Sequence, residues 1–362
     1  MPFNTIPELL DDIRAGRMVV ILDSEDRENE GDLIMAAQKV RPKDVNFMLR
    51  EARGLLCLAL SEERTQQLGL RPMVGNNTSR YHTNFTVSIE AASGVSTGIS
   101  AYDRAHTILT AVQADARPKD LSQPGHVFPL TMRPGGVLAR PGHTEAGSDL
   151  SRLAGLEPAA VLIEILHENG SMARRPDLEI FARKHGLKMG SIAELIRYRL
   201  QNECVIVQVH EETLSTEFGP FRLLIWRDTI RNGLHCALVH GVVDDTAPVL
   251  TYIHRSCIFS ELFHLKQSIK EPFFTSVLGH MAAEESSVLL LLSGEETTDS
   301  LLARFKAVRD AQATPARLWC QYQYGLCAQM LNKLGVRTLR MLGGSDMAMG
   351  LGALGLEVIK SA

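Results

Sequence analysis

The first core strand of this chain is predicted at Met18-Val19-Val20-Ile21-Leu22, a short run of branched apolar residues that ends at a polar break. The chain then enters Asp26-Arg27-Glu28-Asn29-Glu30-Gly31-Asp32, a group of carboxylates around one arginine. In an extended segment alternate residues point the same way, so Glu28, Glu30 and Asp32 would share one face. Such a face is either a solvated polar edge or a set of oxygen ligands for a hard divalent ion such as Mg²⁺.

A second polar segment, Arg140-Pro141-Gly142-His143-Thr144-Glu145, has a similar character. Pro141-Gly142 predicts a turn, and Thr144 is a typical N-cap for the helix expected after it. A helix N-terminus with Arg140 beside it suits a phosphate group. His143 could complete a metal site with a carboxylate of the first segment, and a purely structural histidine is the equal alternative.

Other features carry weaker signals. The Gly-, Ser- and Thr-rich run over residues 93–104 resembles an anion-cradling loop that ends at a helix start. His126 follows a Pro-Gly pair directly before a predicted strand. Glu164 lies within an apolar run that we interpret as a helix, so its carboxylate is either buried with a partner or exposed on a cleft wall. Cys57, in an apolar strand, is interpreted as a core residue.

Composition limits the class of protein. The 362 residues fit two domains, and 45% hydrophobic residues are enough for ordinary globular cores. The net charge of -4 gives no basic field for nucleic acid, and the apolar runs are too short to span a membrane. The N-terminus lacks the pattern of a signal peptide, and the cysteines form no CxxC pair. We therefore expect a reduced, cytoplasmic protein.

Strand-like and helical runs alternate over the first part of the chain, which predicts a mixed α/β domain with flanking helices. The strands are expected at residues 18–22, 55–60, 83–89 and 127–132. The helices are expected at residues 42–53, 103–113, 144–154, 159–167, 176–185 and 192–200. A domain boundary is predicted between residues 202 and 203, before a strand at 205–209. The second domain, 203–362, is again predicted as α/β, with strands at 223–226 and 236–239.

Ordered motifs make the first domain, residues 1–202, similar to a known family. Residues 26–33, 97–104, 124–130 and 140–146 resemble 3,4-dihydroxy-2-butanone 4-phosphate synthase, an enzyme of riboflavin biosynthesis. The resemblance implies that D-ribulose 5-phosphate is enolised, dehydrated and rearranged to L-3,4-dihydroxy-2-butanone 4-phosphate, with loss of formate. It also implies two Mg²⁺ ions per site, with Mn²⁺ as an alternative, and a homodimer with each active site near the subunit interface.

The resemblance also assigns roles to residues of this chain. Glu28 and His143 would bind the metal ions, and His126 and Glu164 would be the essential acid–base groups. The substrate would contact Arg27, Glu28, Asp32, Arg140, Pro141, Gly142, His143, Thr144 and Glu164. These roles agree with the chemistry, because an enediolate carries negative charge on adjacent oxygens and its proton transfers need groups such as histidine and glutamate.

The second domain resembles GTP cyclohydrolase II, over residues 226–228, 235–241 and 324–336, but its zinc site is incomplete. Of that family's three zinc-binding cysteines only Cys257 has a counterpart, and residues 263–267 read Phe-His-Leu-Lys-Gln where a C-x-C pair is expected. We therefore expect a folded domain that binds no zinc and does not open GTP. The alternatives are a bifunctional enzyme, a regulatory or interaction module, and an improvised metal site at His254 or His264.

Overall fold

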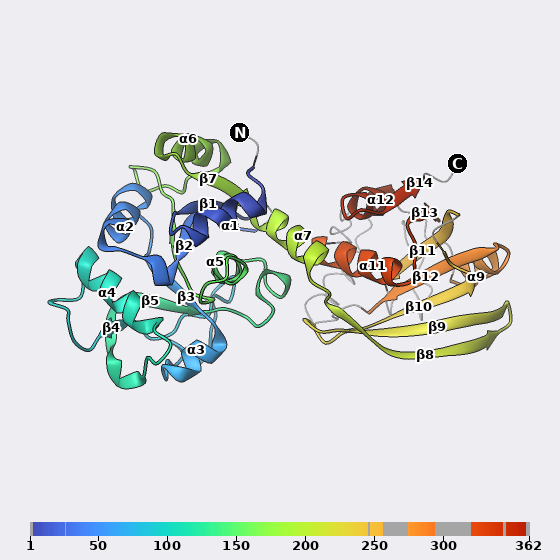
Figure 1. Cartoon of the computed structure of the whole chain (residues 1–362), viewed down its shortest axis with the longest axis horizontal. Coiled ribbons are helices and arrows are strands. Elements are labelled where there is room, and N and C mark those ends of the chain that lie inside the picture. The colour runs from blue at the N-terminus through green and yellow to red at the C-terminus, as the bar shows by residue number, and fades with distance from the viewer. Residues whose placement is uncertain are drawn as a thin grey trace. The chain divides into compact units, whose positions relative to one another are not determined.

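Each half of the chain forms one seven-stranded sheet with parallel and antiparallel pairs, flanked by helices (Figure 1). The chain divides into two units, Met1–Tyr198 and Arg199–Ala362. The structure is a computed structural model, and it describes residues 3–25, 27–244, 247–255, 274–293, 320–342 and 345–359. The α/β class predicted for both halves is confirmed.

The strands of the first unit are arranged in the order β4-β5-β3-β6-β2-β1-β7. They are β1 Val19–Leu22, β2 Gly31–Ala36, β3 Cys57–Leu60, β4 Ile89–Ala91, β5 Leu121–Thr131, β6 Ala160–Glu164 and β7 Lys188–Ser191. The helices are α1 Ile6–Arg14, α2 Pro42–Phe47, α3 Glu62–Gln67, α4 Ala101–Ala111, α5 His143–Leu153 and α6 Arg175–His185, and α7 Ile192–Asn202 begins in the first unit and ends in the second. A π-helical turn, Met48–Ala52, follows α2, and short 3₁₀ turns lie at Ala37–Lys39, Pro118–Asp120 and Gly136–Leu138.

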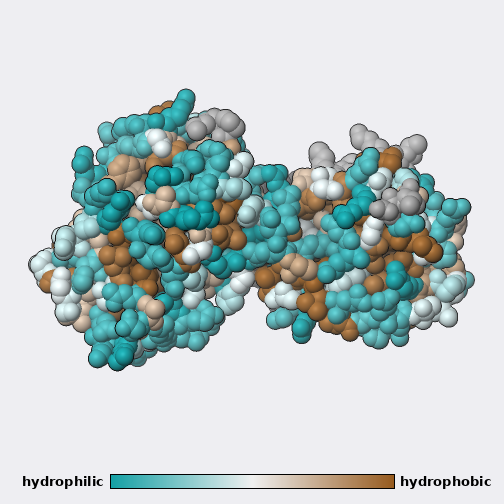
Figure 2. Space-filling model, viewed as in Figure 1, coloured by the Kyte–Doolittle hydropathy of each residue, from teal (hydrophilic) through white to brown (hydrophobic). Residues whose placement is uncertain are grey.

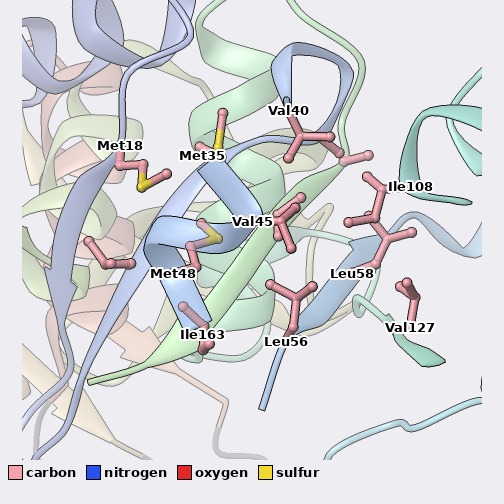
Figure 3. Close-up of a cluster of buried hydrophobic side chains, with 14 of the residues drawn as sticks. Met18, Met35, Val40, Val45, Met48, Leu56, Leu58, Ile108, Val127 and Ile163 are labelled. Carbon is pink, nitrogen blue, oxygen red and sulfur yellow. The ribbon is translucent and has the colours of Figure 1, made fainter. Parts of the chain in front are cut away.

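The central strands of this sheet are buried along their whole length, as expected where helices cover both faces. On one face Met35, Leu58 and Ile163 belong to the cluster drawn in Figure 3, together with Val45 and Met48 from α2 and the π-helical turn. On the other face α5 packs against β2 and β6. The polar residues of the site lie at the edge of this helix–sheet–helix sandwich.

Two secondary-structure predictions for the first unit were wrong. Residues 159–167 do not form a helix, because β6 runs through them between β3 and β2. A short apolar run has no periodicity that separates a buried strand from a buried helix. The strand predicted at 83–89 is absent, since β4 begins only at Ile89 and the preceding residues make isolated bridges. The strand β2, which begins within the acidic segment at Gly31, was not predicted.

The predicted helices 42–53, 103–113, 144–154, 176–185 and 192–200 correspond to observed helices, with changes at their ends. The first of them changes to a π-helical turn and ends at Arg53, which has a left-handed φ of 72°. Ser191 caps the start of α7, because its hydroxyl accepts the Glu194 N–H at 3.2 Å. The predicted cap at Thr144 is wrong: Gly142 is the N-cap, and α5 begins at His143.

The strands of the second unit are arranged in the order β14-β13-β11-β12-β10-β9-β8. They are β8 Ile206–Thr216, β9 Gly219–Asp228, β10 Leu234–Gly241, β11 Val249–Arg255, β12 Ser286–Leu292, β13 Thr338–Met341 and β14 Glu357–Ile359. The helices described are α9 Phe274–Ala282, α11 Gln321–Lys333 and α12 Ser345–Gly352. The predicted strands at 205–209, 223–226 and 236–239 correspond to β8, β9 and β10. Phe221, Tyr252 and Leu289 belong to a core cluster of this unit.

Hydrophilic residues cover much of the visible surface of both units, with hydrophobic patches between them (Figure 2). Within the described part of the chain, every helix is too short or too polar to cross a lipid bilayer.

Candidate functional site

A small pocket of about 130 Å³ lies where β2 and β3 begin and β6 ends. It is lined by Arg27, Glu28, Asp32, Leu55, Cys57, Thr83, Phe85, Leu130, Arg140, His143, Thr144, Leu162 and Glu164. Most of the site residues proposed from the sequence therefore meet here. Pro141, Gly142 and His126 are not among the lining residues. Cys57 is buried as predicted, yet it also contributes to the pocket wall.

Strand pairing brings two carboxylates together at the centre of the pocket. In the antiparallel register of β2 and β6, Asp32 lies directly opposite Glu164. Like charges in this arrangement normally destabilise a sheet. Asp32 is buried, and its Oδ1 has no hydrogen-bond partner. Burial, and then the negative charges of Glu164, Glu30 and Glu28, raise the pKa of Asp32 well above its usual value. The site thus holds more negative charge than its own side chains neutralise.

The backbone after the π-helical turn fixes the Glu164 carboxylate. The Leu55 N–H donates to Glu164 Oε2 at 2.8 Å. Gly54 lies against the same residue, and a Cβ at position 54 would be 2.5 Å from both the carbonyl oxygen and Oε2 of Glu164. The left-handed Arg53 and the side-chain-free Gly54 therefore let the chain approach Glu164 closely enough to hold it.

His143, the first residue of α5, has one ring nitrogen available toward the pocket. Its Nε2 lies 3.1 Å from the Ile21 carbonyl oxygen, so the N–H is on Nε2 and donates to that carbonyl. Its Nδ1 lies 3.8 Å from Asp32 Oδ1. Burial lowers the pKa of His143 to about 4, so the imidazole is neutral near pH 7. A histidine that donates one N–H to a backbone carbonyl and presents its other nitrogen is the usual arrangement of a metal ligand.

Among the residues that the structure describes, one group of at least three side chains could hold a metal ion: Asp23, Glu28 and His143, whose ligand atoms lie within 4.8 Å of one another. Asp23 is already occupied. Its Oδ2 accepts from Arg27 Nη1 at 2.9 Å and from the Glu28 N–H at 3.1 Å, and its Oδ1 accepts the Glu30 N–H at 2.8 Å. Glu28 and His143, with the unpartnered Asp32 oxygen nearby, are the donors that fit a hard divalent cation.

Two arginines add positive charge to the pocket. Arg140 donates to Glu145 Oε2 at 2.8 Å, to the Tyr81 carbonyl at 3.1 Å and to Thr83 Oγ1 at 3.2 Å. Arg27 donates to Glu28 Oε2 at 2.6 Å. These bonds hold both guanidinium groups beside the N-terminus of α5, where a phosphate group would meet positive charge and helix amides.

The remaining candidates lie elsewhere in the first unit. His126 is on β5, where its Nδ1 lies 3.2 Å from Glu90 Oε2. In the Gly-, Ser- and Thr-rich loop, the Asp103 carboxylate accepts the Ser96 hydroxyl at 2.8 Å and the Gly98 N–H at 3.1 Å. Those donors are therefore already occupied inside the loop, which does not support its interpretation as an anion cradle.

A larger hollow of about 410 Å³ lies in the second unit, beside α11. Its lining includes Gln329, whose side chain binds the Leu200 carbonyl at 2.9 Å and the Val205 N–H at 2.9 Å. This hollow has no counterpart of the carboxylate and histidine group of the smaller pocket among the residues that line it. We therefore place the candidate site in the first unit.

The zinc question for the second unit concerns residues outside the described part of the chain. Cys257, His264 and residues 263–267 are not described. His254 lies on β11, with its ring centroid 6.1 Å from that of Tyr252. The expectation that this domain binds no zinc stays a prediction.

Several contributors were missed by the sequence analysis because they act through backbone atoms or lie far away in the chain. Leu55 and Tyr81 are examples, since one supplies its N–H to Glu164 and the other its carbonyl oxygen to Arg140. Asp23 and Glu145 were also not singled out, although Asp23 directly follows the first predicted strand and Glu145 ends the second polar segment.

Comparisons with known proteins show what each half of the chain is similar to. Residues 7–198 match the family model for 3,4-dihydroxy-2-butanone 4-phosphate synthase, and residues 207–362 match the model for GTP cyclohydrolase II. A protein named 3,4-dihydroxy-2-butanone 4-phosphate synthase from Pseudomonas aeruginosa is 45% identical, over 99% of each chain. A similar chain named riboflavin biosynthesis protein RibBA, from Aquifex aeolicus, is 43% identical, over 99% of this chain and 91% of the relative.

Solved structures show the same likeness. RibBX from A. baumannii, a two-domain 3,4-dihydroxy-2-butanone 4-phosphate synthase, is 43% identical, with a TM-score of 0.83 over 99% of this chain and 100% of that one. A synthase of this name in complex with two magnesium ions is 42% identical, with a TM-score of 0.54 over 56% of this chain and 99% of that one. The chain therefore belongs to the 3,4-dihydroxy-2-butanone 4-phosphate synthase family.

Proposed function

We propose that this chain converts D-ribulose 5-phosphate to L-3,4-dihydroxy-2-butanone 4-phosphate and formate, in riboflavin biosynthesis. The observation that carries the proposal is the pocket itself, in which Glu28, His143 and the unpartnered oxygen of Asp32 lie beside two arginines. Family membership and the two-magnesium relative support the same reading. Mg²⁺ is the proposed metal, and Mn²⁺, which prefers similar oxygen ligands, is a second candidate.

We assign the residues of the pocket to substrate binding, metal binding and proton transfer. Arg27, Arg140 and the amides at the start of α5, including Thr144, are the groups that would bind the phosphate and orient the sugar. Pro141 and Gly142 form the turn that brings Arg140 and His143 together. When bound to Glu28 and His143, the metal would neutralise the charge of an enediolate. Glu164, whose Oε2 accepts the Leu55 N–H, would accept and return a proton at the substrate carbons.

His126, the second proposed acid–base group, does not line the pocket of its own chain. We propose a homodimer in which His126 of one copy serves the pocket of the other. Ile99 and Tyr102, in the loop before and at the start of α4, are 51% and 68% exposed, and a second copy would cover such apolar residues. Mixing the inactive variants Glu164→Ala and His126→Ala, with subunit exchange, should restore formate release. Two inactive parents that stay inactive when mixed would contradict the shared site.

The direct test of the activity is formate release from D-ribulose 5-phosphate and Mg²⁺, with a chelator control. Glu28→Ala should abolish it, and Glu25→Ala, an exposed carboxylate of the same segment, should not. Metal-dependent formate that is lost only with Glu28 would support both the reaction and the ligand. A folded, metal-loaded protein that releases no formate would exclude the proposed activity.

The proposal for the second domain, residues 203–362, is that it does not open GTP. A GTP turnover assay with added zinc tests this, and turnover would make the chain bifunctional. A truncation before Glu203 tests whether the second domain has a role in assembly or regulation. Unchanged activity and oligomeric state of the truncated chain would exclude such a role. We also propose that the chain works in the cytoplasm; the described cysteines are free thiols, as a reducing compartment allows.

A further inference from the structure

We propose that Arg174 is a positioning residue, which holds residues 27–31 of the acidic segment in the shape needed to bind a cation. Arg174 is the N-cap residue of α6 and does not line the pocket. The identity of the cation rests on the proposed function, whereas the contacts of Arg174 do not.

Arg174 binds the backbone of the segment at its tightest turn. Its Nη1 donates to the carbonyl oxygens of Glu28, at 2.7 Å, and Asn29, at 2.5 Å. Asn29 has a left-handed φ of 55°, which is uncommon for a residue other than glycine. Such a backbone persists only where its surroundings determine it, and the two bonds to Arg174 do so from the carbonyl side.

The same turn is held from its amide side by Asp23. The Asp23 carboxylate accepts the N–H groups of Glu28, at 3.1 Å, and Glu30, at 2.8 Å. Tyr81 adds a bond from its hydroxyl to the Arg27 carbonyl, at 2.7 Å. Side chains from separate parts of the chain therefore fix both the amides and the carbonyls around Glu28. Among them, Arg174 is the side chain that donates to the Glu28 carbonyl oxygen.

Two contacts fix the first turns of helix α6 beside the acidic segment. The Arg174 N–H donates to Asp177 Oδ2 at 3.0 Å, which closes the first turn of the helix. One turn further on, Leu178 lies against Gly31, where an added Cβ would be 2.4 Å from Leu178 Cδ1. Both ends of the contact between α6 and the acidic segment are therefore fixed, one by hydrogen bonds and the other by close packing.

The physical need for such a clamp follows from charge. Ionised carboxylates at the alternate positions 28, 30 and 32 repel one another, so a loose segment would move them apart. Holding the backbone keeps the Glu28 carboxylate near His143 before any cation arrives. Residues that orient metal ligands in this way typically change metal affinity by about 10- to 100-fold when they are replaced.

The test compares Arg174→Met with Arg175→Met, a matched control at the next residue. Arg175 is exposed and contacts the Phe3 ring and Glu179 instead of the acidic segment. The readouts are the Mg²⁺ dissociation constant by calorimetry without substrate, and hydrogen exchange of the amides of residues 27–31 without metal. Arg174→Met should weaken Mg²⁺ binding by about 10- to 100-fold and speed exchange, whereas Arg175→Met should change neither. Arg174→Lys keeps the charge without the guanidinium and should recover part of both effects.

An Arg174→Met protein with wild-type exchange at residues 27–31 and a Mg²⁺ dissociation constant within about twofold of wild type would overturn the inference. If the wild-type chain binds no Mg²⁺, the proposed function fails, and the exchange comparison then decides the role of Arg174 alone. If Arg174→Met does not fold, the hydrogen exchange of Arg174→Lys is used instead. Wild-type exchange at residues 27–31 in Arg174→Lys would then overturn the inference.

Discussion

Each unit buries an aspartate near the end of a strand, and the two aspartates differ in what surrounds them. Asp32, on β2, faces other carboxylates and has an oxygen without a partner. Asp228, the last residue of β9, accepts the Tyr322 hydroxyl at 2.6 Å and the N–H groups of Ile230, at 2.8 Å, and Arg231, at 3.1 Å. Burial alone would raise the pKa of Asp228, but the nearby His235 and these donors lower it.

The difference separates a structural carboxylate from one that we propose to be functional. Asp228 is stabilised as an anion by groups of its own unit, so it contributes to folding and needs no ligand. Asp32 is held in a position that its own unit does not stabilise, and a bound cation would supply what is missing. A buried aspartate at a strand terminus, the start of β2 or the end of β9, therefore has opposite consequences in the two units, and its hydrogen-bond partners decide which.

The largest effect is expected for Asp32→Asn. The substitution should reduce formate release by about 100-fold or more, because the site loses a negative charge that faces the cation. It should leave the free energy of unfolding of the metal-free protein unchanged or higher, because repulsion from Glu164 is relieved. Formate assays and thermal unfolding with a chelator measure the two effects. A metal-free variant that is less stable by more than about 1 kcal/mol would contradict the comparison.

The opposite result is expected for Asp228→Asn, which should lower the unfolding free energy of the second unit by about 2–3 kcal/mol through weaker hydrogen bonds. Formate release should persist where the protein is folded. Both tryptophans of the chain, at positions 226 and 319, are in this unit, so tryptophan fluorescence reports its unfolding. Glu217→Gln, an exposed site in the turn after β8, is the control. If Asp228→Asn and Glu217→Gln had the same unfolding free energy, Asp228 would not be a structural residue.

The pH dependence of that effect has a definite sign. Because the folded pKa of Asp228 is lowered, its contribution to stability is complete above the unfolded value of about 4 and is lost as the pH falls through the folded value. The difference in unfolding free energy between wild type and Asp228→Asn should therefore shrink on acidification. Denaturant titrations followed by tryptophan fluorescence at several pH values measure it, and a difference that grows toward acid would refute this assignment.

The smallest effect is expected for Arg231→Met. The Arg231 guanidinium carbon lies 4.2 Å from the centroid of the Tyr322 ring, and losing this cation–π contact should cost about 0.5–1 kcal/mol. The Asp228–Tyr322 hydrogen bond should remain. The same fluorescence measurement applies. A loss of unfolding free energy as large as that of Asp228→Asn would mean that Arg231 also positions Asp228 and Tyr322.

The sequence predicted the parts of the site that are continuous in the chain. Arg27, Glu28 and Asp32 occur together, as do Arg140, His143 and Thr144, and elementary chemistry indicated a cation and a phosphate. Arg174 and Leu55 were not predicted, because one acts on backbone carbonyls of a distant segment and the other contributes only its N–H. Such roles depend on tertiary contacts, which leave no pattern in the local sequence.

The fold was predictable to a similar extent. The strand at 18–22 and the helix at 176–185 were found because their apolar pattern and their ends agree. The run at 159–167 was assigned to the wrong class because it is buried on both sides in the middle of a sheet. That error also placed Glu164 on a helix, whereas it ends a strand beside Asp32.

The cross-strand pair of Asp32 and Glu164 has a consequence for how sequences of this family can vary in length. A shift of one residue between β2 and β6 would turn one of these carboxylates to the opposite face of the sheet. The same shift would move Leu33 or Ile163 from the cluster of Figure 3 to the face that α5 covers, and the packing of both faces would be lost. Insertions and deletions among relatives should therefore be confined to the connections outside residues 31–36 and 160–164, since a chain that changed either strand would lose its core and its chemistry in one step.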